Sequence, residues 1–143
     1  MMAVSTKGRY SVRIMAFLAS QPSDHVATKI EIAAAEGTSP QYVQQLMMQL
    51  GVAGLVNSRR GRNGGFLLAR PPESITVASV LRAAEGEVQL APCRSAASCE
   101  RAANCPARSM WMRATELVEE VFQSTTIAQL VNGHTGHDGE RQA

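Results

Sequence analysis

Residues 28–50 read TKIEIAAAEGTSPQYVQQLMMQL and contain two short helix patterns on either side of one glycine. The T-x-x-E motif at the start is a capping box, which marks the first helix. Gly37 can adopt the positive φ that ends a helix. Ser39 is a good N-cap, and Pro40 suits the first helical position because no amide donor is needed there. Two short helices joined by a tight glycine turn predict a helix-turn-helix.

The apolar spacing of the second helix, residues 40–50, supports this prediction. Its apolar residues recur on one face, at Val43, Leu46, Met47 and Leu50. A small residue, Ala33, precedes Gly37 by four positions and would let the two helices approach each other. An ordinary helical hairpin is the alternative that this stretch leaves open.

The sequence after the helix pair favours a β-hairpin. Residues 52–58 (VAGLVNS) end a helix at Gly54 and begin a strand, and residues 66–69 (FLLA) form the second strand. Asn63-Gly64 between them is a strong signal for a tight turn. A hairpin after a helix-turn-helix predicts a mainly α fold with a small β-hairpin, the winged helix-turn-helix arrangement. Its second helix can enter a major groove while the wing lies along the backbone or minor groove.

The same two elements carry side chains suited to DNA. Glutamine amides can bond base edges, and arginines in and around the hairpin turn pair naturally with phosphates. A solvated Gln-rich face and a solubility role for the arginines are the alternatives. The predicted DNA-binding residues are Lys7, Ser39, Gln41, Tyr42, Gln44, Gln45, Arg59, Arg60 and Arg62.

Composition and charge agree with a small protein that has an anionic partner at one end. The chain has 143 residues, enough for one ordinary domain, and only 4% aromatic residues, so the core must be aliphatic and Met-rich. Residues 1–70 hold eight Lys and Arg against three Asp and Glu, a net charge of +5. Residues 71–143 hold six Arg against nine carboxylates, a net charge of −3.

Other classes of protein are disfavoured. No apolar run reaches about 18 residues, so no membrane span is expected. The N-terminus lacks the order of a signal peptide, and three cysteines argue against a disulfide framework, so we expect a cytoplasmic protein. No nucleophile–base motif, phosphate loop or paired-carboxylate site points to an enzyme.

The three cysteines lie together at Cys93, Cys99 and Cys105, in a C-x5-C-x5-C pattern. Thiolates are soft ligands suited to iron–sulfur clusters, zinc and Cu(I). Structural zinc usually needs closer cysteine pairs and four protein ligands, whereas a loop of small residues can wrap a wider group. Pro106 predicts a helix that starts directly after Cys105, where helix amides would favour an anionic cluster. Three unremarkable cysteines in a loop are the alternative.

A long amphipathic helix is predicted at about residues 106–123. Its apolar stripe includes Met110, Leu117 and Val121, and outside a small winged domain such a stripe needs a partner surface. A symmetric homodimer is the natural solution, and folding back on the same chain is the alternative.

The expected organisation has four parts. These are a winged helix-turn-helix domain at residues 1–86, a cluster-binding loop at 87–106, a dimerisation helix with a final short helix at 107–132, and a disordered tail at 133–143.

Several stretches together resemble the Rrf-two family of bacterial transcription regulators. They are residues 5–13 (STKGRYSVR), 39–46 (SPQYVQQL), 53–70 (AGLVNSRRGRNGGFLLAR), 75–86 (ITVASVLRAAEG) and the three-cysteine loop. The resemblance implies a homodimer that binds double-stranded DNA at a pseudo-palindromic operator. It also implies that Cys93, Cys99 and Cys105 ligate an iron–sulfur cluster, 4Fe–4S or 2Fe–2S, whose state changes DNA affinity or site choice.

The fourth cluster ligand departs from the family pattern. One branch of the family has a His three residues after the last Cys, where this chain has Arg108, and arginine has no acceptor to ligate with. Another branch uses an N-terminal Asp, and the comparable position here is Arg9. The fourth ligand is therefore unassigned between a small exogenous ligand and the candidates Glu100, Asn104, Ser109, His25, His134 and His137.

The leading hypothesis is a cluster-sensing, DNA-binding transcription regulator, expected to repress, that responds to iron, redox or nitric oxide status. A second hypothesis keeps DNA binding and lets the three thiols sense oxidants directly, without a cluster. A third is an iron–sulfur carrier with no DNA role, and the basic N-terminal half argues against it.

Overall fold

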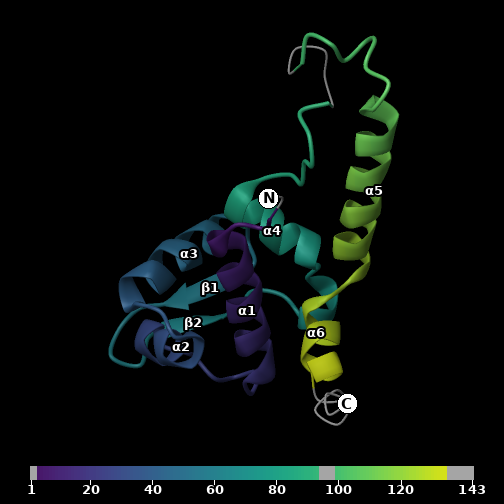
Figure 1. The fold of residues 1–143 in the computed structure, drawn as a ribbon. Helices are drawn as coiled ribbons and strands as arrows, with labels where there is room; N and C mark the ends of the chain where they lie inside the picture. The colour runs from purple at the N-terminus through teal and green to yellow at the C-terminus, as the bar shows by residue number, and fades with distance from the viewer. Residues whose placement is uncertain (1–2, 94–98, 135–143) are drawn as a thin grey trace, which may run out of the picture.

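The computed structural model describes residues 3–93 and 99–134 and confirms a mainly helical fold with one β-hairpin (Figure 1). The elements in chain order are α1 (Thr6–Ser20), α2 (Lys29–Glu36), α3 (Pro40–Val52), β1 (Val56–Arg59), β2 (Gly65–Leu68), the short 3-10 helix η1 (Pro72–Ser74), α4 (Val77–Glu85), α5 (Arg108–Ser124) and α6 (Ile127–His134). The predicted tail falls outside the described residues from position 135 onward.

The helix-turn-helix is formed by α2 and α3, and local hydrogen bonds explain its ends. The Thr28 hydroxyl accepts from the Glu31 amide at 3.1 Å and starts α2. The Glu31 carboxylate does not return to Thr28 as the capping box predicts, because it pairs with His25 Nε2 at 2.8 Å. Gly37 ends α2 in the left-handed region, with φ 67°, which a residue with a Cβ rarely adopts.

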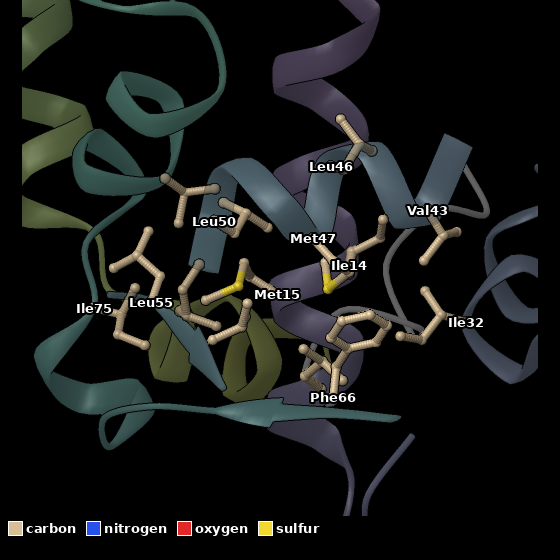
Figure 2. Close-up of a cluster of buried hydrophobic side chains, with 14 of the residues drawn as sticks. Ile14, Met15, Ile32, Val43, Leu46, Met47, Leu50, Leu55, Phe66 and Ile75 are labelled. Carbon is tan, nitrogen blue, oxygen red and sulfur yellow. The ribbon is translucent and has the colours of Figure 1, made fainter. Parts of the chain in front are cut away.

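The core lies where α1, α3 and the hairpin meet, and it is aliphatic and Met-rich as predicted. Ile14 and Met15 of α1 are fully buried, and Met47 of α3 is 1% exposed. Figure 2 shows Phe66 of β2 close to these side chains. Each buried Ile or Met side chain contributes roughly 1.5–3 kcal/mol relative to exposure, so this cluster fixes α3 and the wing relative to α1.

The last helix, α6, packs against α1 and η1. Ile127 is fully buried in the core, and its amide donates to the Ile75 carbonyl at 2.9 Å. A capping box opens α6, because Thr126 and Gln129 bond reciprocally at 2.9 and 3.1 Å. The expected organisation groups α6 with the long helix at residues 107–132, whereas α6 contacts the N-terminal elements of the chain.

The long helix, α5, projects from the domain (Figure 1). Of its 17 residues, only Thr115 is buried. It begins at Arg108, so the predicted start at Pro106 is wrong. Instead Cys105–Arg108 forms a turn in which the Arg108 amide donates to the Cys105 carbonyl at 3.3 Å, and Pro106 occupies the second position, where its fixed φ fits. Within the described residues, no helix is long and apolar enough to cross a membrane.

Candidate nucleic-acid interface and thiol loop

Helix α3 presents its polar residues away from the core. The Ser39 hydroxyl accepts from the Tyr42 amide at 3.1 Å, so this side chain caps the helix, with Pro40 in the first turn. Gln41 and Gln45 are exposed, and Gln44 is half-buried. The buried face holds this helix on the core, and its opposite face is therefore available to a groove.

Tyr42 has a packing role that the sequence did not reveal. Its ring meets the Tyr10 ring of α1 edge-on, with centroids 5.7 Å apart. The Arg13 guanidinium lies 5.1 Å from the Tyr10 centroid and pairs with Glu36 at the end of α2, at 2.7 Å. This chain of contacts ties the start of α3 to α1 and α2 and sets the direction in which α3 projects.

The wing is the antiparallel pair β1–β2, in which Arg59 pairs with Gly65. The predicted tight turn at Asn63-Gly64 is present within a longer connection, because five residues separate this pair. The Gly64 amide donates to the Gly61 carbonyl at 3.0 Å, so Arg62 and Asn63 are the central residues of a four-residue turn. A Cβ on Gly64 would collide with the Arg59 carbonyl, so this loop requires glycine there.

Three arginines surround the wing turn. Arg59, at the end of β1, and Arg60 and Arg62, in the loop, are all exposed. Close to the turn, strand β2 is held to Ala27, two residues before α2, by paired hydrogen bonds between Ala27 and Phe66, at 2.8 and 2.9 Å. The fold thus carries these charges on a hairpin that is anchored to the helix-turn-helix.

Lys7 is half-buried and lies in the first turn of α1. This turn packs on the end of α4, where the Ser5 hydroxyl donates to the Glu85 carboxylate. A Cβ on Gly8 would come within 2.7 Å of Glu85 Oε1 and 3.0 Å of Leu81 Cδ2. Glycine at position 8 therefore permits the close approach of α1 and α4.

The thiol loop is residues 93–105, of which 94–98 lie outside the described part. Cys93, Cys99 and Cys105 are half-buried free thiols. In the described part of the loop, the Ala102 amide donates to the Cys99 carbonyl at 3.1 Å, and Ala102 is only 5% exposed. Among the described residues, no group of three or more His, Cys, Asp or Glu side chains is gathered as a metal site.

Arg108 joins the two ends of the thiol loop. Its Nε donates to the Cys93 carbonyl at 3.1 Å, and its own amide donates to the Cys105 carbonyl at 3.3 Å. Arg108 occupies the position where the resemblance places a histidine ligand. Its two hydrogen bonds instead hold both ends of the loop to the first turn of α5. Sequence reasoning recognised that arginine cannot ligate and missed this second role.

The candidates for a fourth ligand differ in where the structure places them. Glu100, Asn104 and Ser109 are exposed, and each lies close in the sequence to one of the described thiols. His25 is engaged with Glu31, beside α2. His137 and the side chain of His134 lie outside the described part of the chain.

A helix-turn-helix followed by an arginine-bearing hairpin defines the winged helix-turn-helix class of DNA-binding proteins. A family model described as an iron-dependent transcriptional regulator, Rrf2, matches residues 4–133. The chain is 37% identical over 142 residues to the HTH-type transcriptional regulator CymR of Bacillus subtilis, covering 99% of this chain and 96% of CymR. It is 31% identical over 131 residues to the HTH-type transcriptional regulator IscR of Yersinia enterocolitica, covering 92% of this chain and 80% of IscR.

Solved structures of CymR and IscR share the fold of this chain. The structure of CymR, the global cysteine regulator of B. subtilis, superposes with a TM-score of 0.75 at 34% identity, over 93% of this chain and 98% of that one. The structure of IscR from T. potens superposes with a TM-score of 0.76 at 33% identity, over 93% and 88% of the two chains. The chain belongs to the Rrf2 family of transcriptional regulators, which bind DNA. Its relatives here are transcriptional regulators and not enzymes.

Proposed function

We propose that this chain is a homodimeric regulator whose affinity for operator DNA follows the state of its thiol loop, with an iron–sulfur cluster as the group that the loop holds. The observation that carries the proposal is the position of the loop. It connects α4 of the DNA-binding domain to α5, and Arg108 fastens both of its ends to the start of α5. A change in the loop would therefore move α5.

The DNA-binding part of the proposal is supported by shape and charge. The exposed Gln41 and Gln45 of α3 are followed in the chain by a wing with three exposed arginines. This half of the chain is the basic one, at +5. Neutralising phosphates supplies most of the non-specific affinity of such proteins, and base contacts from the helix supply specificity.

The homodimer is supported by the exposed stripe on α5. Met110, Leu117 and Val121 are 56%, 45% and 60% exposed and recur at spacings of seven and four, which places them on one side of the helix. A mostly apolar groove of about 670 Å³ lies where α1 and α4 meet the end of α5, and Leu81 and Phe122 are among its lining residues. Two copies could cover these apolar surfaces reciprocally across a two-fold axis.

This part has its own test. Sedimentation of the Leu117→Arg variant should give a folded monomer, because a charge in the middle of the stripe cannot be buried without a partner. Glu116→Arg, on the neighbouring exposed position, should stay dimeric. Equal dimerisation of both variants would refute a dimer through this stripe.

The donor set of the loop fits an iron–sulfur cluster, because three thiols without disulfide bonds are the soft ligands that such clusters take. Cys93, Cys99 and Cys105 would hold the cluster, and Arg108 would keep Cys93 and Cys105 at the start of α5. When bound, a cluster supplies a centre whose oxidation or loss reports on iron, oxygen or nitric oxide. A set of three protein thiols with a weak or exogenous fourth ligand suits a labile sensor better than an electron carrier.

The test is to purify the full chain anaerobically, reconstitute it with iron and sulfide, and measure bound iron, bound sulfide and visible absorption. The proposal expects a coloured protein, and separate Cys→Ser substitutions at the three thiols should each remove most of the iron. Ser124→Ala, at an exposed position at the far end of α5, is a control expected to keep it. A colourless protein with no iron after reconstitution would refute the cluster.

A second candidate is a cluster-free regulator whose thiols respond directly to oxidants or to small thiols. It is favoured by the 37% identity to CymR, the global cysteine regulator of B. subtilis. The same three variants separate the candidates, because thiol switching predicts one disulfide between two of the cysteines and no iron. Mass spectrometry of the oxidised protein under non-reducing conditions would identify that pair.

A further inference from the structure

The outward face of α3 is polar in its first half and apolar in its second half. At about 100° per residue, Gln41, Gln45, Met48 and Val52 lie within about 60° of one another, opposite the buried face of the helix. Met48 is 63% exposed and Val52 is 92% exposed. The structure therefore leaves two apolar side chains uncovered on the helix face that the winged fold directs at DNA.

The major groove offers an apolar partner for such a side chain. Each A·T pair presents the 5-methyl group of thymine there, and apolar side chains contact it. The three exposed arginines of the adjacent wing make this surface positively charged, which favours DNA over a protein partner as its occupant.

Position along the helix separates the two apolar residues. At 1.5 Å per residue, Met48 lies about 10 Å along the axis from Gln41, and Val52 lies about 16 Å from it. Recognition helices contact base edges with their N-terminal residues, so Met48, which is nearer to Gln41, is better placed to enter the groove than Val52.

We infer that Met48 is a specificity-determining residue that packs on the 5-methyl group of a thymine in each half-site, next to the bases faced by Gln41 and Gln45. The inference rests on the proposed DNA-binding function and adds one position to its readout. A long, flexible thioether side chain suits this contact, because it can adjust to a methyl group without a fixed hydrogen-bond geometry.

The experiment uses the full chain and a duplex selected from a randomised library long enough for two half-sites. Each thymine is then replaced in turn by deoxyuridine, which removes only the methyl group. Dissociation constants at one salt concentration are compared for wild type, Met48→Ala and Val52→Ala. We expect one thymine in each half-site whose replacement weakens wild type by about fourfold, the equivalent of exposing one methyl group. Met48→Ala should bind both duplexes equally, and Val52→Ala should keep the wild-type difference.

The outcomes are distinguishable. A wild type that selects a sequence but is indifferent to every deoxyuridine would overturn the methyl contact and leave DNA binding intact. Equal loss of methyl discrimination in Val52→Ala and Met48→Ala would overturn the assignment to Met48. A wild type that selects no sequence at all would refute the proposed DNA-binding function. Unfolding curves of both variants confirm that each protein compared is folded.

Discussion

Replacing Gly65 by alanine tests how the wing is anchored. A Cβ at position 65 would collide with the Ala27 carbonyl oxygen, which is backbone and cannot rotate away as a side chain could. The same carbonyl accepts from the Phe66 amide at 2.8 Å, and the Ala27 amide donates to the Phe66 carbonyl at 2.9 Å. Relieving the collision means giving up this pair of bonds, each worth about 0.5–1.5 kcal/mol net, so the free energy of unfolding should fall by about 1–3 kcal/mol.

Urea unfolding measures this change in stability. With a slope of about 1–3 kcal/mol per M for a small domain, the midpoint should fall by about 1 M at an unchanged slope. Gly51→Ala in α3 is the matched control, because the nearest atom to its Cβ would be 3.9 Å away. That change should be neutral or stabilise by up to about 1 kcal/mol, as glycine is a poor helix former. A Gly65→Ala midpoint within error of wild type would refute the collision.

Three further predictions concern the core, the wing and the loop. Ile127→Ala should lower the free energy of unfolding by about 2–5 kcal/mol, because the side chain is fully buried; a decrease below about 1 kcal/mol would place α6 outside the core. Arg60→Ala should weaken binding to most duplexes and reduce the log–log salt slope by about 0.9 for each phosphate that the arginine neutralises, whereas Gln44→Ala should change base preference by about 1–3 kcal/mol; a uniform weakening in both would contradict base readout by the glutamine. Arg108→Gln should raise the rate at which maleimide reacts with Cys93, the first thiol of the loop, by about fivefold, which corresponds to the free energy of one hydrogen bond. Arg101→Gln, at an exposed position in the same loop, should leave this rate unchanged. Equal rates in the two variants would refute the role of Arg108 in holding the loop.

Local signals in the sequence were enough to predict the DNA-binding unit. The cap at Ser39 and the turn at Gly37 depend on neighbours within a few residues, so the bounds of α2 and α3 followed from the sequence closely. Asn63-Gly64 marked the position of the turn but not the length of the loop, which the pairing of Arg59 with Gly65 sets at five residues. That register also depends on the bridge between Ala27 and Phe66, which no local pattern encodes.

The features that the sequence did not predict depend on contacts between segments that are distant in the chain. The position of α6 follows from a bond between residues 127 and 75, and the contact of Tyr42 with Tyr10 spans two helices. Helix α5 starts later than predicted because Pro106 fits a turn as well as a first helical position, and the bond from Arg108 to Cys93 accompanies that turn. The fourth ligand could not be predicted, because it depends on which groups the fold brings near the three thiols, and spacing in the sequence does not show this.

The most direct test of the central claim, that the thiol loop governs DNA binding, is the affinity of the anaerobically prepared protein for its selected duplex before and after exposure to oxygen. Iron, sulfide and visible absorption are recorded on the same sample, and a variant with serine at Cys93, Cys99 and Cys105 is measured in parallel. We predict a change of at least about tenfold in wild type, which corresponds to about 1.4 kcal/mol of coupling, together with loss of iron and colour. The triple variant should not respond. A wild type whose affinity is unchanged by oxygen, or a triple variant that responds equally, would contradict the account.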